Sequence, residues 1–544
     1  MIPNFPKPYK PYPHQIPVLE QLDEAIKNKT KFIILQAPTG SGKSMFAGAL
    51  ANTTRCASKK IVSHIDDNTY FSKTALNGYQ NEDEIAEEDT FGSFTLTVSK
   101  QLQNQYTNLF EDSCLLKGRV NYACAVDDSF TCEISPCHLS SKTMAECIKE
   151  KKCPFINARN STMKANFGVL NYNMFFCLPD FAKRRQIIIC DEATELEDQI
   201  VDYHSVSINY SELQKFYKIN VKKLLVEDRH KGRLWLIDLY KHVKDVIKDE
   251  SSKMGGKQSA YLNKKEFQSL FKLKKLVRLH DSLTTVINNW HKAEYIVERI
   301  EDGVTFTPLC VNNLTNCIFD HADHVVLMSA TIIDHKTFAN TLGIKDYKYI
   351  EAESTFDSAK SPIYCPGKYM LNYANINKNL DKVAKQVVEI CNNHPNEKGI
   401  IHTHSFKITE AIQRLTKGQD RFLFREAGVN NEMLLDSHFE NSTNSVIVSP
   451  SLGYGTDLIG EHGRFQIIVK LPYLPLGSKR IKTLAKQNFK WYNMKMLISL
   501  IQMSGRCTRS KEDESVTYIL DGQAVSTLKK SWNSLPLYFK SRLK

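Results

Sequence analysis

Our interpretation of this chain starts from Ala37-Pro38-Thr39-Gly40-Ser41-Gly42-Lys43-Ser44, the stretch APTGSGKS. The apolar run Phe32-Ile33-Ile34-Leu35 precedes it, and the helix-compatible segment MFAGALA follows. Glycines at 40 and 42 let the backbone turn tightly, so that successive N–H groups face an anion at the start of a helix. The stretch predicts a phosphate-binding loop in which Lys43 contacts the β- and γ-phosphates of a nucleotide and Ser44 binds Mg²⁺.

The loop departs from the strict pattern at one position, because Ala37 stands where the first glycine is expected. The alternative is an ordinary strand-to-helix turn rich in Gly and Ser. An apolar strand, a glycine-rich turn and a helix in succession are the setting that a phosphate loop requires. This context favours the phosphate loop.

Length and charge limit the class of protein. A chain of 544 residues is too long for one core and predicts three or four domains. Lys and Arg outnumber Asp and Glu by 72 to 60, a net charge of +12, which suits a polyanionic partner without requiring one. The proline-rich start lacks the apolar core of a signal peptide, and no run approaches the ~18 apolar residues of a membrane span. We therefore expect a soluble cytoplasmic protein that does not associate with membranes.

Cysteines give the second strong signal. Six of the 14 lie between Cys114 and Cys153, although a reducing compartment disfavours disulfides. Cys124, Cys137, Cys147 and Cys153 could hold either a [4Fe–4S] cluster or Zn²⁺, with Cys114 and Cys132 as extra thiols. The absence of a CxxC pair weakens a zinc ribbon. The remaining alternative is a set of unrelated buried thiols.

Two carboxylates follow an apolar strand farther along the chain. The run Gln186–Cys190 leads directly into Asp191 and Glu192, about 150 residues after the phosphate loop. In a nucleotide hydrolase one carboxylate holds Mg²⁺ and the next polarises the attacking water. An Asp-Glu pair at a strand end is common by itself, but at this position it is the expected partner of the phosphate loop.

Segments around these motifs leave several questions open. Gln15, at the start of a predicted helix, could contact an adenine edge or could be a solvated surface residue. The polar stretch 53–92 predicts an insertion or a mobile loop. The strand Phe94–Val98 precedes a glutamine-rich helix that could contact a nucleic-acid backbone, although its first residues could simply cap the helix.

Residues 200 to about 305 predict an inserted, mainly helical domain. Leu236, Leu239, Val243 and Ile247 recur at helical spacing. A basic run at 272–275 could contact nucleic acid, but a charged run is more often a solvated face.

A second α/β pattern begins beyond residue 360, after a strand that ends in Ser329-Ala330-Thr331. It closes with a long helix that leads into Gln502, Arg506 and Arg509. Two parallel-sheet halves predict a nucleotide cleft between them, which arginines of the second half could complete.

The ordered set APTGSGKS, TVSKQLQNQY, LKGRVNYAC with its cysteines, DEAT, MSAT, GTDL and QMSGRCTRS resembles the superfamily 2 helicases of the XPD/DinG type. The similarity runs from about Gln15 to the LDGQ segment. It implies an α/β fold with two RecA-like motor domains, the first carrying an inserted Fe–S domain and an inserted helical arch. The first motor is expected at 1–110, 161–199 and 311–355, the Fe–S domain at 111–160, the arch at 200–310 and the second motor at 356–544.

The resemblance also implies roles for single residues. Asp191 would position Mg²⁺, Glu192 would be the catalytic carboxylate, and Gln502, Arg506 and Arg509 would be the residues of the last motif. Asp457 would sense the nucleotide from the second motor. The cluster ligands would be Cys124, Cys137, Cys147 and Cys153, with Cys132 as the chief competitor. Thr194 stands where the family has His, which puts the link to the MSAT strand in question.

The activity that the resemblance implies is ATP-driven 5′→3′ translocation on single-stranded DNA by a monomer that opens forked DNA, with ATP, Mg²⁺ and a [4Fe–4S] cluster as cofactors. An alternative is a translocase or RNA-directed ATPase without productive unwinding. A binding scaffold that uses ATP only as a ligand is disfavoured, because Glu192 and the late arginines form a hydrolytic set.

Overall fold

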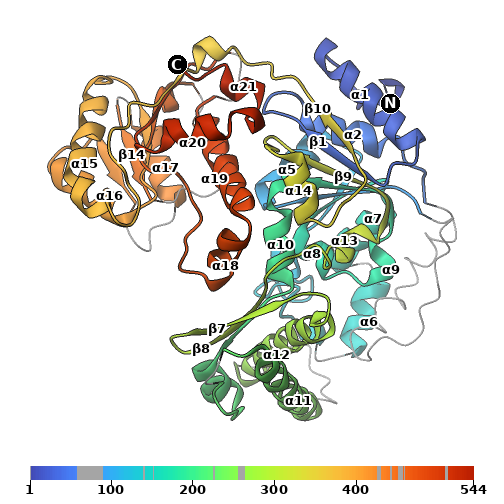
Figure 1. Cartoon of the computed structure of the whole chain (residues 1–544). Helices are drawn as coiled ribbons and strands as arrows, with labels where there is room; N and C mark the ends of the chain where they lie inside the picture. The colour runs from blue at the N-terminus through green and yellow to red at the C-terminus, as the bar shows by residue number, and fades with distance from the viewer. Residues whose placement is uncertain are drawn as a thin grey trace.

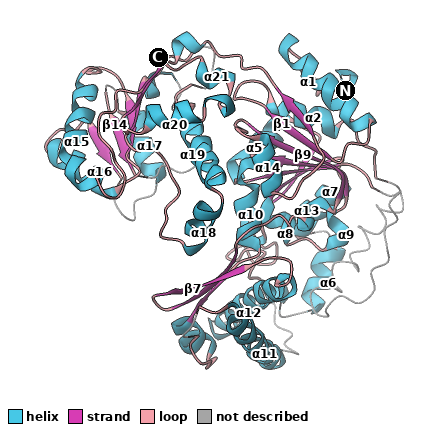
Figure 2. Cartoon of the chain, viewed as in Figure 1, coloured by secondary structure: helices cyan, strands magenta, loops and turns pink. Residues whose placement is uncertain are grey.

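The computed structural model describes residues 2–57, 90–138, 141–150, 152–224, 227–254, 264–425, 431–441, 444–450, 458, 460–508 and 512–544. These residues form two parallel β-sheets, each flanked by helices, and a smaller antiparallel sheet beside a pair of long helices (Figures 1 and 2). Most of the polar stretch 53–92 lies outside the described residues. Among the described helices, none is both long and apolar enough to cross a bilayer.

The first parallel sheet has seven strands in the order β10-β1-β9-β5-β2-β4-β3. Residues far apart in the sequence supply them: β1 (Phe32–Gln36), β2 (Ser93–Thr97), β3 (Ser113–Leu116), β4 (Phe167–Asn171), β5 (Arg185–Asp191), β9 (Ala322–Ser329) and β10 (Lys348–Glu351). The central strands are apolar and buried along almost their whole length, as expected for a parallel sheet covered on both faces.

The register of this sheet brings three sequence motifs to one edge. Gln36 at the end of β1 pairs with Ser329 of β9, and Asp191 at the end of β5 pairs with Met328. In open parallel sheets, ligands bind outside these carboxyl ends. The loop after β1, the acidic pair after β5 and the Ser329–Thr331 segment therefore meet there.

Helices pack on both faces of this sheet. They are α1 (Ile16–Lys27), α2 (Lys43–Ala51), α5 (Lys100–Leu109), α7 (Pro154–Lys164), α8 (Tyr172–Phe176), α9 (Asp180–Lys183), α10 (Leu196–Tyr203), α13 (Asn316–Phe319) and α14 (His335–Thr341).

The second parallel sheet has six strands in the order β11-β16-β15-β12-β14-β13. They are β11 (Ile363–Tyr364), β12 (Gly399–His402), β13 (Phe422–Phe424), β14 (Val446–Ser449), β15 (Phe465–Ile468) and β16 (Val516–Ile519). The helices of this half are α15 (Ile376–Asn392), α16 (Phe406–Leu415), α17 (Asn431–Glu440), α18 (Lys479–Gln487), α19 (Phe489–Ser504), α20 (Ala524–Lys530) and α21 (Leu537–Lys540). The two parallel sheets confirm the predicted α/β fold class.

The region predicted to be mainly helical also contains a sheet. Two long helices, α11 (Arg229–Met254) and α12 (Lys264–Asn289), pack together beside an antiparallel sheet of β6 (Val206–Asn209), β7 (Tyr295–Ile300) and β8 (Gly303–Pro308). Leu236, Leu239 and Val243 are fully buried between the helices and this sheet, as their spacing predicted. The strands are the part that the sequence interpretation missed.

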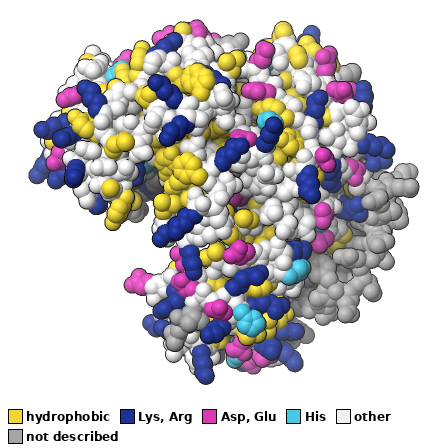
Figure 3. Space-filling model, viewed as in Figure 1, with side chains coloured by type: hydrophobic (Ala, Val, Ile, Leu, Met, Phe, Trp, Pro, Cys, Tyr) yellow, Lys and Arg dark blue, Asp and Glu magenta, His cyan; other side chains and the backbone are white. Residues whose placement is uncertain are grey.

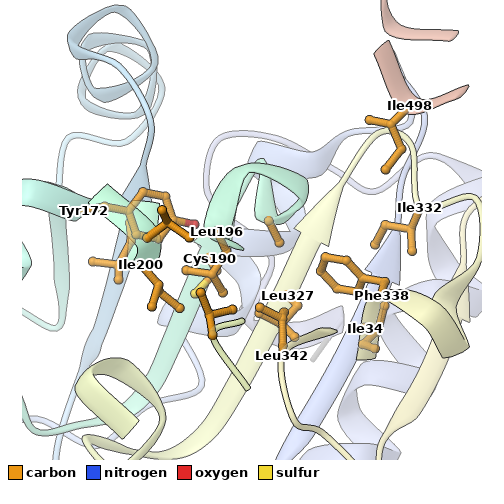
Figure 4. Packing of buried hydrophobic residues seen from close by; sticks show 14 of the residues in the cluster. Ile34, Tyr172, Cys190, Leu196, Ile200, Leu327, Ile332, Phe338, Leu342 and Ile498 are labelled. Atoms are coloured by element: carbon orange, nitrogen blue, oxygen red, sulfur yellow. The ribbon is translucent and has the colours of Figure 1, made fainter. Parts of the chain in front are cut away.

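The core of the first half continues into the second. Figure 4 shows Ile498 of α19 beside Ile332 and Phe338. Ile34 and Leu327 of the first sheet belong to the same buried cluster. Ile498 is 4% exposed and Ile332 is 2% exposed. Burial of apolar surface across this boundary contributes to holding the two halves together.

Candidate functional site

The loop after β1 has the backbone that anion binding requires. Gly40 and Gly42 adopt positive φ angles of 79° and 97°, and α2 begins directly after Gly42. A Cβ atom on Gly42 would lie 2.1 Å from Nε2 of Gln15, and one on Gly40 would lie 2.9 Å from the ring of Phe356. The Ser41 hydroxyl donates to the Pro38 carbonyl at 2.6 Å and closes the turn. Both glycines are thus required by conformation and by space.

Gln15 stabilises this loop through its side-chain hydrogen bonds. Its side-chain amide donates to the Ser41 carbonyl at 3.0 Å, and its side-chain oxygen accepts from the Tyr12 N–H at 2.9 Å. Gln15 is 2% exposed, so it is not a solvated surface residue.

Lys43 and Glu192 form an ion pair across the site. Lys43 is the first residue of α2, and Glu192 follows β5 in a left-handed backbone conformation with φ of 49°. This conformation is uncommon for a residue with a side chain, and such strain clusters at functional sites. It turns the Glu192 carboxylate toward the loop, where Lys43 balances its charge.

Ser329, the last residue of β9, hydrogen-bonds to Glu192. Its hydroxyl donates to Oε2 of Glu192 at 3.1 Å and lies 3.2 Å from the hydroxyl of Thr194. Thr194 stands where the XPD/DinG-type pattern has His, yet a link from the DEAT segment to the MSAT strand is present. A hydroxyl in place of an imidazole therefore retains this connection.

Asp191 lies deeper than Glu192 and is 4% exposed. Tyr106 of α5 donates its hydroxyl to Oδ2 of Asp191 at 2.9 Å, and the Glu192 N–H donates to Oδ1 at 3.0 Å. Burial raises the pKa of Asp191, and nearby Lys43 opposes that rise. Mg²⁺ prefers oxygen ligands, and a divalent cation here would favour the ionised carboxylate, so the Ser44 hydroxyl and the Asp191 carboxylate fit Mg²⁺.

Tyr106 is a site residue that the sequence interpretation did not single out. It is fully buried, and burial together with Asp191 raises its pKa well above the usual value, so it remains a protonated donor. The sequence interpretation did consider the helix after β2 for its glutamines, and Tyr106 directly follows them in LQNQY.

The second half contributes the end of α19. Gln502 lies in its last turn, and Arg506 follows it with 9% exposure. Burial first, and then Arg506, lower the pKa of His402 well below its usual value, which puts the guanidinium near the end of β12. The side-chain oxygen of Gln502 is buried and has no hydrogen-bond partner among the described residues. Arg509 and Asp457 lie outside the described residues.

The thiols of the cysteine segment influence one another. Burial and then Cys153 raise the pKa of Cys132 to about 12 and that of Cys147 to about 11. Burial also raises the pKa of Cys137, with smaller contributions from Cys124 and Cys153. Cys132, Cys137 and Cys147 therefore each lie near both Cys124 and Cys153. Within the described part of the chain, however, no three Cys, His, Asp or Glu side chains are arranged to hold a metal ion.

Cys114 stands apart from this group. It belongs to β3, a strand of the seven-stranded sheet, and its pKa is raised by burial and by Asp112 rather than by another thiol.

Comparisons with known proteins match both halves of the chain. The family of the helicase C-terminal domain matches residues 387–541, and the family of the type III restriction enzyme res subunit matches residues 8–227. The chain is a helicase, and its second half carries a helicase C-terminal domain. It is accordingly an ATP-hydrolysing enzyme. No curated protein matches the sequence.

Solved helicase structures share the fold over nearly the whole chain. A structure titled "XPD_Helicase" is 15% identical, with a TM-score of 0.63, and the alignment covers 96% of this chain and 98% of that one. A structure of S. tokodaii Xpd4 is 13% identical, with a TM-score of 0.53 and coverage of 97% and 99%. At these identities the structures establish the fold of this helicase and not its substrate.

Proposed function

We propose that this helicase acts on DNA, that it translocates 5′→3′ on a single strand as a monomer, and that its cysteine-bearing domain separates the duplex at a fork. The observation that carries the proposal is the convergence of Lys43, Asp191, Glu192 and Ser329 at one sheet edge. Both halves of the nucleotide site would come from one chain, so a second copy is not needed for hydrolysis.

In the proposed hydrolysis each residue has a separate task. The backbone N–H groups of residues 37–44 bind the ATP phosphates. Lys43 leaves its ion pair with Glu192 and binds the γ-phosphate instead. Glu192, released from that ion pair, orients and deprotonates the attacking water, while Ser329 holds its other oxygen. Ser44 and Asp191 would hold Mg²⁺, which neutralises developing phosphate charge.

The second motor would complete the site when the cleft closes. Arg506 and Arg509 are assigned as arginine fingers, Gln502 as a contact to the γ-phosphate or the water, and Asp457 as a nucleotide sensor. The side-chain oxygen of Gln502, which has no partner among the described residues, supports a contact to the water, because a buried acceptor without a partner is costly unless a donor binds it.

We assign a [4Fe–4S] cluster to Cys124, Cys137, Cys147 and Cys153, with Cys132 as the competing ligand. The chemistry of the donor set supports this assignment, because Cys124 and Cys153 both contribute to the raised pKa values of Cys132, Cys137 and Cys147. Five thiols therefore lie near one another, although among the described residues they are not arranged around a metal ion. A bound cluster would cross-link a segment that has little regular structure and would lower those pKa values by its charge. All 14 cysteines are free thiols, in keeping with a reducing, intracellular setting.

The contact region between the cysteine segment and the long-helix domain supports the choice of single-stranded nucleic acid. Phe130 contacts Phe267 at 5.9 Å between ring centroids, and Phe267 stacks on Phe271 at 6.4 Å. Lys275 lies 5.2 Å from the Phe271 ring and 5.4 Å from that of Phe216. Partly exposed aromatic rings beside lysines are the elements of a base-stacking path. Figure 3 shows further Lys and Arg side chains over the same long-helix domain.

We divide the chain as the resemblance suggests, with the first motor at 1–110, 161–199 and 311–355, the cysteine-bearing domain at 111–160, the arch at 200–310 and the second motor at 356–544. We move both ends of the cysteine-bearing domain inward. β3 belongs to the first sheet and α7 packs against it, so the cysteine-bearing domain starts after β3 and ends before α7.

The test is a strand-displacement assay on duplexes with 5′ or 3′ tails of DNA or RNA. The proposal expects ATP-dependent unwinding only with a 5′ DNA tail. Hydrolysis without displacement on any substrate would indicate a translocase, and activity confined to RNA tails would indicate an RNA-directed ATPase. Iron and acid-labile sulfide near four per chain after anaerobic purification would support the cluster. Zinc or no metal would contradict it.

A further inference from the structure

A short segment of the second motor reaches the catalytic edge of the first. Tyr538 lies on α21, in the half built on the second sheet. Its hydroxyl donates to the Ala330 carbonyl at 3.2 Å and lies 3.3 Å from the Thr331 hydroxyl. These two residues directly follow Ser329, whose hydroxyl donates to Glu192. Tyr538 therefore holds the backbone next to the residue that supports Glu192.

Arg542, four residues farther on, contacts the end of α19 and the segment that joins the two sheets. Its guanidinium donates to the Ser504 carbonyl at 2.8 Å and to the Ser361 carbonyl at 2.7 Å. Ser504 is the last residue of α19, two positions before Arg506. Ser361 lies in the connection between the two sheets. Arg542 thus fixes the end of α19 and the connection between the motors at once.

The segment between these two side chains is anchored at several points. The Arg542 N–H donates to the Phe539 carbonyl at 3.2 Å, and Phe539 is fully buried. The Arg542 carbonyl accepts from the Ile363 N–H at 2.7 Å, which ties the segment to the edge strand β11. A displacement of Tyr538 would therefore also displace Arg542.

We propose that Tyr538 and Arg542 are positioning residues that hold the Ser329–Thr331 segment and the end of α19 in register, so that Glu192 and Arg506 act on the same nucleotide. The inference rests on the roles of Glu192 and Arg506 proposed above. Neither Tyr538 nor Arg542 needs to touch ATP. Their contribution is to the geometry in which hydrolysis occurs, where a displacement of about 1 Å can cost up to a hundredfold in rate.

Two ion pairs between the motors lie away from this contact. Lys490 pairs with Asp334 at 2.9 Å, and the Glu197–Arg480 pair joins α10 to α18. Neither contact reaches the Ser329–Thr331 segment or the end of α19. A variant that loses only the Tyr538 hydroxyl should therefore keep the motors together but lose their alignment.

The test compares Tyr538→Phe with Tyr492→Phe. Both changes delete one buried phenolic hydroxyl that donates to a backbone carbonyl, but the Tyr492 hydroxyl binds Leu474 within the second motor, at 2.8 Å. We expect Tyr538→Phe to lower kcat for nucleic-acid-stimulated ATP hydrolysis about tenfold, with KM for ATP within about twofold of wild type. Tyr492→Phe should retain kcat, and the two variants should have the same Tm.

Arg542→Lys extends the test from the other side. Lysine keeps the charge but lacks the planar fork that reaches two carbonyls, so kcat should again fall with KM retained. A wild-type kcat for Tyr538→Phe, or a loss matched by Tyr492→Phe, would overturn the inference. Glu192→Gln serves as the reference: full turnover in that variant would refute the proposed function, whereas an inactive Glu192→Gln beside a normal Tyr538→Phe would refute only the role of Tyr538.

Discussion

Glu197 of α10 and Arg480 of α18 form an ion pair of 2.8 Å between the two motors, and each side chain is only 6% exposed. The same carboxylate accepts from the Trp491 indole at 2.9 Å and lies 3.1 Å from the Lys495 ammonium. One buried acid therefore organises two cations and an indole from the second motor. Such a group is costly to bury and costly to disrupt, because each partner left behind remains desolvated.

Substitution of Glu197 should destabilise the protein strongly. In Glu197→Gln the amide keeps the shape but leaves Arg480 without its buried counter-charge, so we expect a loss of about 3 kcal/mol in the free energy of unfolding. Urea denaturation measures it. Asp381→Asn is the matched control, because the Arg414–Asp381 pair is 67% and 75% exposed and should contribute less than about 0.5 kcal/mol. Equal effects of the two substitutions would contradict a special role for Glu197.

The same pair predicts a pH dependence. Burial alone would raise the pKa of Glu197, but Lys495 and Arg480 together hold it below its usual value. The stabilisation is therefore complete above the unfolded-state pKa of about 4.3 and is lost as the pH falls through the lower folded-state value. The stability difference between wild type and Glu197→Gln should be constant from about pH 6 to 8 and should shrink below about pH 4. A difference that grows in acid would show that the sign is wrong.

The nucleotide residues should separate binding from hydrolysis. Lys43→Ala removes both the phosphate contact and the partner of Glu192, so ATP binding and turnover should fall together. Glu192→Gln should bind ATP but lose about 10²–10⁴-fold in kcat, the usual contribution of a general base. Fluorescent-nucleotide binding and phosphate release distinguish the two variants, with DNA binding as the common control. Normal turnover in either would contradict the assigned site.

The first sheet and the edge at which the candidate residues meet were predictable from the sequence because their signals are local. Apolar runs followed by APTGSGKS, DEAT and MSAT identify β1, β5 and β9, and parallel strands bring those ends together. The small antiparallel sheet was missed although Asp302-Gly303 is a turn signal between two β-rich runs. Helical periodicity in α11 and α12 dominated the prediction for that region.

Contacts between the motors could not be predicted in the same way. Arg480 and Glu197 are 283 positions apart, and Tyr538 and Ala330 are 208 apart. No local pattern encodes such a pairing, because each side chain by itself is compatible with an ordinary surface. The choice of four ligands among six cysteines was beyond sequence reasoning for a related reason: spacing does not determine which thiols converge.

The cysteine assignment predicts separable activities. Cys147→Ser should lose iron and acid-labile sulfide and should impair strand separation, yet keep most of the DNA-stimulated ATP hydrolysis, because the site around Lys43 lies in another part of the fold. Cys114→Ser is the control, since Cys114 belongs to β3 and no other thiol affects its pKa. Cys132→Ser tests the competing ligand. Full iron content in that variant would keep Cys137 in the ligand set, whereas loss of iron would show that Cys132 takes its place.

Tyr106 should set the magnesium requirement of the enzyme. Tyr106→Phe removes the hydroxyl that donates to Oδ2 of Asp191 at 2.9 Å, so the buried carboxylate loses a partner that stabilises its ionised form. A hydrogen bond to a charged group contributes about 1.5–3 kcal/mol, so we expect the Mg²⁺ concentration for half-maximal ATP hydrolysis to rise about tenfold or more, and the Mg²⁺ dependence of nucleotide binding to shift with it.

Tyr172→Phe provides the matched control for this prediction. The Tyr172 hydroxyl donates to the backbone carbonyl of Asp191 at 3.1 Å rather than to the carboxylate. Its loss should lower stability without changing the Mg²⁺ dependence, because the charge of Asp191 is untouched. If both variants shift the Mg²⁺ dependence equally, Tyr106 acts only through packing around Asp191. A shift confined to Tyr106→Phe means that a single phenolic hydroxyl sets the metal affinity of the site.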